Sequence, residues 1–301
     1  MLRIRFHGRG GQGIKTASQI LGSAAFLSEF RAQDFPLYGA ERRGAPIVAS
    51  TRIDRKNVME RGAIYHPDLV LVGDESLIGD PVAAPLSGTD SSTLIFINST
   101  HRPEDLRDHF KLFSLPVSAD LTRLCELHLK RGNVLSTALA AAAARLTGLI
   151  SLEALLQAVD MELGESGLGR EIREKNQTLA GEVFNSMDGG TLVEKERTPE
   201  PAAAFLDMKQ EEVSRAAPLV LTPGNMALRK TGNWRMERPE INYEDCNACW
   251  ICFVRCPDGA MGIGTDGKPV IDYEHCKGCL ICAEECPKHA IHFTREVSAW
   301  V

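Results

Sequence analysis

Two short cysteine motifs near the C-terminus hold eight of the nine cysteines of the chain. Each motif has the spacing C-x2-C-x2-C-x3-C-P, and the second follows the first by thirty residues. The flanking residues repeat at the same offset, because Tyr243 matches Tyr273 and Ala260 matches Ala290. An internal duplication of one cysteine-bearing unit accounts for these pairs.

This spacing is the one with which bacterial ferredoxins hold a 4Fe–4S cluster. Three closely spaced thiolates converge on one cubane, and in two-cluster ferredoxins the fourth comes from the other motif. Disulfides and zinc are the alternatives, but the chain has no recognisable secretory signal and zinc sites do not use this doubled triplet. The sequence therefore predicts one cluster on Cys246, Cys249, Cys252 and Cys286 and a second on Cys276, Cys279, Cys282 and Cys256.

The two motifs differ at the residue before their second cysteine. The second motif has Gly278 there, which we expect to let the backbone approach its cluster closely. The first motif has Ala248 in the equivalent place, and Trp250 after its second cysteine either shields the cluster from water or simply packs.

The overall composition is that of an ordinary globular protein. The 301 residues are 44% hydrophobic and 25% charged, which allows one or two sizeable domains. The net charge of −6 offers no basic surface for nucleic acid. No apolar run reaches the roughly 18 residues that a membrane span requires. We therefore expect a cytoplasmic protein with reduced thiols, in which the ninth cysteine, Cys125, is buried in a core.

The first 187 residues predict an α/β domain. Strand patterns alternate with helical ones, and Asn133 and Ser151 are candidate helix caps. The expected strands cover residues 2–7, 45–53, 68–73 and 93–98, and the expected helices cover residues 14–30, 133–146, 151–159 and 171–184. A linker and extended arm over residues 188–235 and a small α+β ferredoxin-like domain over residues 236–301 complete the chain.

A glycine loop joins the first expected strand to the first expected helix. Gly8, Gly10 and Gly13 fit the G-x-G-x-x-G pattern of dinucleotide sites, and Asp34 stands about where a ribose-binding acid would lie. The loop is not a P-loop, because its lysine follows one residue too late. The loop either receives an anion at the helix N-terminus or is a tight structural turn, and the pattern leaves both open.

Two further stretches, taken with the glycine loop, resemble a known enzyme family. Residues 7–13 (HGRGGQG) and 38–44 (YGAERRG) resemble the gamma subunit of 2-oxoacid:ferredoxin oxidoreductases, with Arg42 and Arg43 suited to an anion or a subunit contact. Residues 231–235 (TGNWR), with the cysteine motifs, resemble the delta subunit. The chain is identified as a fused gamma/delta subunit of this family, most similar in type to the pyruvate enzyme, pyruvate synthase.

The resemblance implies a division of labour between chains. Thiamine diphosphate and magnesium would lie on alpha and beta partner subunits of a hetero-oligomer, where the 2-oxoacid is decarboxylated and coenzyme A takes up the acyl group. Electrons would leave one at a time through the two clusters of this chain to external ferredoxin or flavodoxin. No catalytic residue is expected on this chain. The loop residues that would contact coenzyme A or a partner subunit are Gly8, Gly10, Gly11, Gln12 and Gly13.

Other functions stay open. The chain could be an NAD-linked reductase that uses the glycine loop, or its first domain could only anchor a ferredoxin to another complex. The substrate is open too, since pyruvate, 2-oxoglutarate, branched-chain 2-oxoacids, oxalate or phenylglyoxylate would be selected on other chains.

Overall fold

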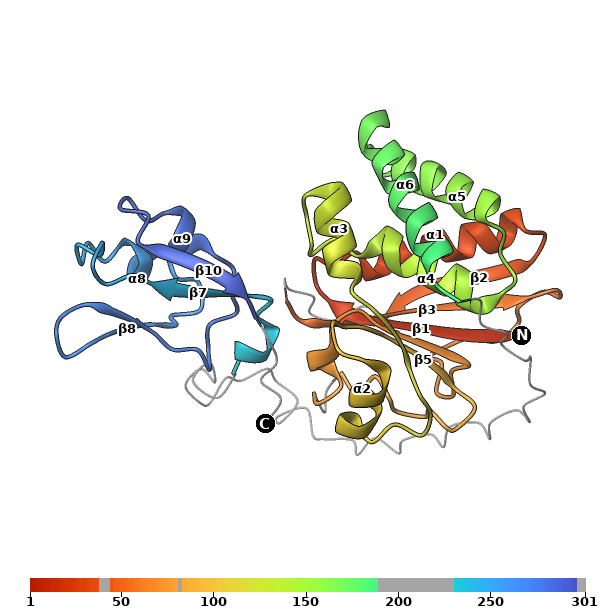
Figure 1. Ribbon diagram of the computed structural model, residues 1–301, viewed down its shortest axis with the longest axis horizontal. Coiled ribbons are helices and arrows are strands. Elements are labelled where there is room, and N and C mark those ends of the chain that lie inside the picture. Colours follow the sequence, from red (N-terminus) through yellow and green to blue (C-terminus); the bar gives the residue numbers. More distant parts are fainter. Residues whose placement is uncertain (38–43, 81–82, 189–229, 297–301) are drawn as a thin grey trace, which may run out of the picture.

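The computed structural model describes residues 1–37, 44–80, 83–188 and 230–296. They form an α/β domain and a small domain that carries both cysteine motifs (Figure 1). Most of the expected linker and arm, and residues 38–43 with Arg42 and Arg43, lie outside the described residues. Within the described ranges, no helix combines the length and the apolar character that crossing a bilayer requires.

The larger domain is built on a mixed sheet of six strands, which are β1 (Leu2–Arg9), β2 (Arg31–Leu37), β3 (Pro46–Asp54), β4 (Leu69–Val72), β5 (Leu94–Asn98) and β6 (Val117–Ala119). Their order is β2-β3-β1-β4-β5-β6. Strands β1, β4, β5 and β6 run parallel to one another, whereas β3 is antiparallel to both β1 and β2. The carboxyl ends of β1, β4, β5 and β6 therefore share one edge of the sheet.

Helices cover both faces of this sheet (Figure 1), and they are α1 (Ile14–Leu27), α2 (Pro103–Phe110), α3 (Leu121–Leu129), α4 (Ser136–Thr147), α5 (Leu152–Glu165) and α6 (Arg170–Ser186). The central strands are buried on both sides, as their continuous apolar runs predict. Leu69 and Leu71 of β4 belong to the core under most of the helices, and Val70 and Val72 pack on the other face with Leu106 of α2.

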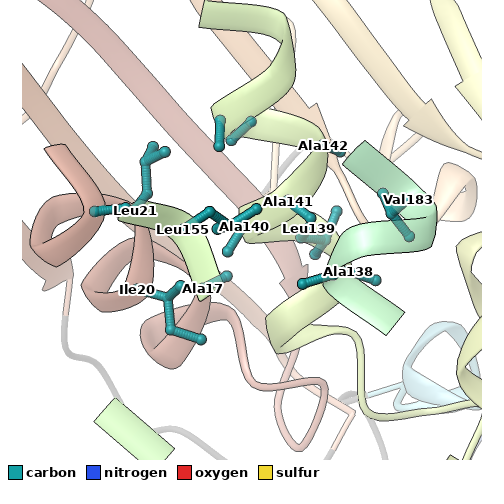
Figure 2. Packing of buried hydrophobic residues seen from close by; sticks show 14 of the residues in the cluster. Ala17, Ile20, Leu21, Ala138, Leu139, Ala140, Ala141, Ala142, Leu155 and Val183 are labelled. Carbon is teal, nitrogen blue, oxygen red and sulfur yellow. The ribbon is translucent and has the colours of Figure 1, made fainter. Parts of the chain in front are cut away.

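Helix α4 is the centre of the helical layer (Figure 2). Its residues 138–144 are fully buried, and all but Leu139 are alanines. Because alanine has a small side chain, Ala17 and Ile20 of α1 and Val183 of α6 can pack close to the α4 backbone. Cys125 is also buried in this core, as expected, and burial raises the pKa of its thiol to about 12.

The helix boundaries differ from expectation in two places. Helix α4 begins at Ser136 and not at Asn133, because the amide of Leu135 is held by the carbonyl of Gln12 at 2.9 Å. Helix α1 ends at Leu27, where Glu29 turns the chain with a φ of 65° into the unexpected strand β2. Ser151 does cap α5, since its hydroxyl accepts a hydrogen bond from the Ala154 amide at 3.2 Å.

The small domain contains two copies of a strand–helix–strand unit. The first copy is β7 (Glu237–Ile241), α8 (Ile251–Arg255) and β8 (Met261–Ile263), and the second is β9 (Pro269–Ile271), α9 (Ile281–Glu284) and β10 (Ile291–Arg295). Strand β7 pairs with β10, and β8 pairs with β9. The first strand of each unit thus pairs with the last strand of the other, and a short helix follows each cysteine triplet.

Candidate iron–sulfur site

The duplication in the sequence folds as a duplication of backbone turns. Ala248 and Trp250 of the first cysteine loop have φ angles of 53° and 65°, and Gly278 and Leu280 of the second have 67° and 61°. These left-handed residues turn the chain around the cysteines immediately before α8 and α9. Both loops therefore present their first three thiols in the same way.

Hydrogen bonds cross between the two repeats. The Tyr243 hydroxyl donates to the carbonyl of Pro269 at 3.1 Å, and the Tyr273 hydroxyl donates to the carbonyl of Pro239 at 2.8 Å. A second symmetric pair joins the backbones, from Asn242 and Asp272 to the alanines after the fourth cysteines. These crossed bonds interlock the repeats, so the end of each motif lies against the start of the other.

Two cavities result, each with an empty volume of about 350 Å³. Each is lined by the first three cysteines of one motif and the fourth cysteine of the other. The described residues contain no three His, Cys, Asp or Glu side chains arranged to hold a single metal ion. The four thiols of each cavity therefore line an open volume and do not converge on a single metal ion. The first cavity has Cys246, Cys249, Cys252 and Cys286, and the second has Cys256, Cys276, Cys279 and Cys282.

The chemistry of this donor set fits two iron–sulfur clusters. Thiolate sulfur is the ligand that such clusters take, and four surround each cavity. Burial raises the pKa of the Cys282 thiol to about 12, and it also raises the pKa values of Cys252 and Cys276. Iron binds the deprotonated thiolates, so cluster binding would release these protons and would become more favourable as the pH rises.

The fourth cysteine of each motif receives a matching hydrogen bond. The amide of Ala260 donates to Sγ of Cys256, and the amide of Ala290 donates to Sγ of Cys286, both at 3.3 Å. Hydrogen bonds to ligand sulfur are one of the means by which a protein sets a cluster's reduction potential. The fourth position is therefore also matched between the repeats.

The glycine loop between β1 and α1 is closely packed. A side chain at Gly8 would collide with Ile14, and a Cβ at Gly13, where φ is 79°, would lie 2.7 Å from Cβ of Ser136. The Gly10 and Gln12 amides donate within the loop region, to the carbonyls of Ala45 and Arg9. Of the five loop residues singled out by sequence, Gly11 alone is exposed. The glycines thus first serve close packing of strand, loop and helix.

Asp34 does not lie at the glycine loop. It lies in β2 and packs against Gly22, with its Cβ 3.4 Å from the position of an added glycine Cβ. Gly22 is eight residues into α1, which places it about 12 Å along the helix from the loop. The pairing of loop and ribose-binding acid that the dinucleotide hypothesis requires is therefore not assembled.

Arg9, which the sequence analysis did not single out, holds the end of the glycine loop by hydrogen bonds from its buried side chain. Its guanidinium is 1% exposed and donates to Asp74 at 2.7 Å, to Ser76 at 2.6 Å and to the Gly44 carbonyl at 3.1 Å. The only sequence signal was a basic residue at the end of a strand. Arg9 thus ties the glycine loop to Gly44, the last residue of the second conspicuous stretch.

Comparison with known proteins assigns the family. The profile described as pyruvate ferredoxin/flavodoxin oxidoreductase matches residues 3–185, and a 4Fe-4S binding domain profile matches residues 269–292. The gamma subunit common to the pyruvate/ketoisovalerate oxidoreductases of Pyrococcus furiosus is 36% identical over 189 residues, which are 62% of this chain and 98% of that protein. Pyruvate synthase subunit PorC of Methanocaldococcus jannaschii is 37% identical over 187 residues, 62% of this chain and 97% of that protein.

A solved structure agrees with these matches. Pyruvate oxidoreductase subunit PORC from Thermotoga maritima superposes with a TM-score of 0.51 at 31% identity, over 61% of this chain and 95% of that one. The matches thus span nearly all of each relative and the larger part of this chain. The chain therefore belongs to the pyruvate ferredoxin/flavodoxin oxidoreductase family and carries a 4Fe–4S binding domain in addition.

Proposed function

We propose that this chain is the electron-transfer subunit of a thiamine-diphosphate-dependent 2-oxoacid:ferredoxin oxidoreductase. The observation that carries the proposal is the pair of four-cysteine cavities on the same chain as a domain of this family. With pyruvate, the complex would convert pyruvate, coenzyme A and two oxidised ferredoxins into acetyl-coenzyme A, carbon dioxide, a proton and two reduced ferredoxins.

The eight motif cysteines would hold the two clusters in the crossed arrangement that the cavities favour. When bound, each cluster accepts one electron and passes it on. The protein holds the two cavities in fixed relation through the crossed tyrosine hydrogen bonds and keeps Cys252 and Cys282 largely away from water. A reducing cytoplasm suits a chain with this many thiols.

The reacting acid would be bound and decarboxylated on other chains. We assign thiamine diphosphate and magnesium to alpha and beta subunits, because the relatives are named as single subunits of such enzymes. The Pyrococcus furiosus relative is named as common to a pyruvate and a ketoisovalerate enzyme, which supports selection of the acid elsewhere. Pyruvate is our first assignment, and 2-oxoglutarate, branched-chain acids, oxalate and phenylglyoxylate are the alternatives.

For the glycine loop we propose a contact with coenzyme A through Gly11. The other four loop residues, Gly8, Gly10, Gln12 and Gly13, are buried or half-buried and would support that contact from behind. In the assembled complex, Gly11→Asp places a carboxylate where a phosphate would approach, so the KM for coenzyme A should rise. An unchanged KM would remove this part of the proposal. The NAD-linked alternative is disfavoured by the distant position of Asp34.

The proposal is tested by purifying this chain anaerobically, alone and together with its partner subunits. The chain alone should hold about eight irons and turn over no 2-oxoacid. The complex should reduce ferredoxin or flavodoxin with one acid of a panel, and only when coenzyme A is present. Turnover by the chain alone, or a complex inactive with every acid of the panel, would contradict the proposal.

A further inference from the structure

A short segment ahead of the first cysteine motif contacts both domains. We call residues 231–237 the strap. It includes a single helical turn, Gly232–Trp234, and the first residue of β7. Some of its residues contact the larger domain, including the glycine loop region, and others contact the second cysteine loop.

On one side the strap meets the glycine loop. The Gln12 side-chain amide, which is itself 5% exposed, donates to Sδ of Met236 at 3.4 Å. The Trp234 carbonyl packs so closely on Gly44 that an added Cβ there would collide with it. Gly44 has a φ of 88° and is also the residue whose carbonyl Arg9 holds. The strap thus packs on a part of the larger domain that the buried Arg9 side chain holds in place.

The surrounding contacts lie at the same edge of the sheet. The Asn233 side-chain amide donates to the buried carboxylate of Asp80 at 3.0 Å, and Arg295 contacts Thr122 at 3.2 Å and Asp120 at 3.8 Å. These partners follow β4 and β6, as Gln12 follows β1. The carboxyl edge of an open sheet is the usual ligand-binding place of such folds. In this chain the small domain covers part of that edge (Figure 1).

On its other side the strap holds the second cysteine loop. Arg235 is 8% exposed, and its guanidinium donates to the carbonyls of Tyr273 and Cys276, both at 2.8 Å. The same guanidinium pairs with Glu296 at 2.6 Å. The Gly232 amide donates to the carbonyl of Glu274 at 2.8 Å. The described contacts of Arg235 thus reach the loop of the second cluster.

The difference between Gly278 and Ala248 has its explanation here. An added Cβ at Gly278 would collide with the Glu237 carbonyl and lie 2.6 Å from Cγ of Arg235. Ala248 occupies the same left-handed turn in the first loop, with φ of 53°, so the turn itself accepts alanine. Gly278 is therefore required for the close approach of the strap, and its close approach to a cluster stays a prediction.

We propose that the strap is a two-sided clasp. Through Trp234 and Met236 it docks the small domain on Gly44 and the glycine loop, and through Arg235 it fixes the second cysteine loop. The Gln12 part of the glycine loop is therefore covered by a segment of the same chain, whereas Gly11 stays exposed. The proposal holds whichever 2-oxoacid the complex uses. It also predicts that a disturbance at Gly44 is transmitted to the second cysteine loop and not to the first.

Amide hydrogen exchange on the full chain, with its clusters assembled anaerobically, tests the clasp. Gly44→Ala should accelerate exchange in residues 231–237 and 273–278 roughly tenfold or more, because the added methyl overpacks the seat of Trp234. Gly62→Ala is the matched control, since Gly62 has a φ of 82° and no atom within 4 Å of an added Cβ. It should leave both segments unchanged, and residues 243–248 should be unchanged in both variants.

A second pair of variants tests the other side. Gly278→Ala should accelerate exchange in the strap, and Gly259→Ala, with a φ of 62° and open space around it, should not. The clasp is refuted if Gly44→Ala behaves like Gly62→Ala, or if the strap exchanges at unprotected rates in the unmodified chain. Iron content, measured on the same samples, reports on the clusters separately, so loss of the proposed function and loss of the clasp give different results.

Discussion

The crossed assignment of the cysteines can be tested by counting iron in pairs of cysteine variants. Cys286 belongs to the second motif by sequence, but its thiol lines the cavity of the first triplet. Replacing Cys286 and Cys249 together by alanine therefore damages one cavity only. The chain should keep about four of about eight irons.

The matched pair removes two cysteines of one motif. Cys282→Ala with Cys286→Ala damages both cavities, so the chain should keep almost no iron. If each motif held its own cluster, the two results would be exchanged. Cys125→Ser is the control, because this thiol is buried in the larger domain and should not change the iron content.

The assay is iron and acid-labile sulfide per chain after anaerobic reconstitution. The low-temperature EPR spectrum of the reduced Cys249/Cys286 variant should show one isolated cluster. About four irons in the Cys282/Cys286 variant, with almost none in the Cys249/Cys286 variant, would refute the crossed arrangement.

Two further predictions concern the larger domain. His7 is buried, and burial lowers its pKa from 6.5 to about 3, so the folded state stays unprotonated while the unfolded state binds a proton below pH 6.5. The free energy of unfolding should therefore fall by about 1.4 kcal/mol per pH unit as the pH drops from 6.5 towards 3. In urea titrations at pH 6.5 and pH 5, His7→Phe should remove this contribution to the pH dependence of stability. An unchanged pH dependence in the variant would contradict the burial argument. Gly13→Ala should destabilise the domain by roughly 2–5 kcal/mol, through backbone strain and overlap with Ser136. Gly167→Ala is the control, because Gly167 has the same φ of 79° and open space around it, and it should destabilise the domain by roughly 1–2 kcal/mol. Equal urea midpoints for the two variants would contradict the close packing of the loop.

The sequence could predict the cysteine cavities because the signal is local. The three cysteines of each triplet lie close together in the sequence. The offset of thirty residues also relates Tyr243 to Tyr273, and these two tyrosines make equivalent hydrogen bonds. The central strands were also predictable, since burial on both faces demands continuous apolar runs such as that of β4.

Several of the elements that the sequence analysis did not predict have a weak local pattern. Strand β2 contains Asp34 and Pro36, which an edge strand tolerates because one side forms no ladder. Helix α2 buries Leu106 alone, so it shows little apolar periodicity. Strand β6 has only three residues.

The surroundings of the glycine loop could not be predicted from its own residues. Its pattern is shared by dinucleotide sites and tight turns, and the choice depends on what the chain places nearby. Met236 reaches Gln12 from more than two hundred residues away in the sequence, and β2 carries Asp34 to the side of α1 instead of the loop. Such long-range contacts follow from the packing of whole elements.

The most direct test of the relay function separates chemistry from electron transfer in the assembled complex. Cys249→Ala removes a ligand of the first cavity and leaves the larger domain unchanged. Decarboxylation of the 2-oxoacid in a single turnover should proceed at a rate close to that of the unmodified complex, whereas ferredoxin reduction should fall by about a hundredfold or more, because one cluster of the relay is missing. Equal loss of both activities, or undiminished ferredoxin reduction, would contradict the assignment of this chain as the electron relay.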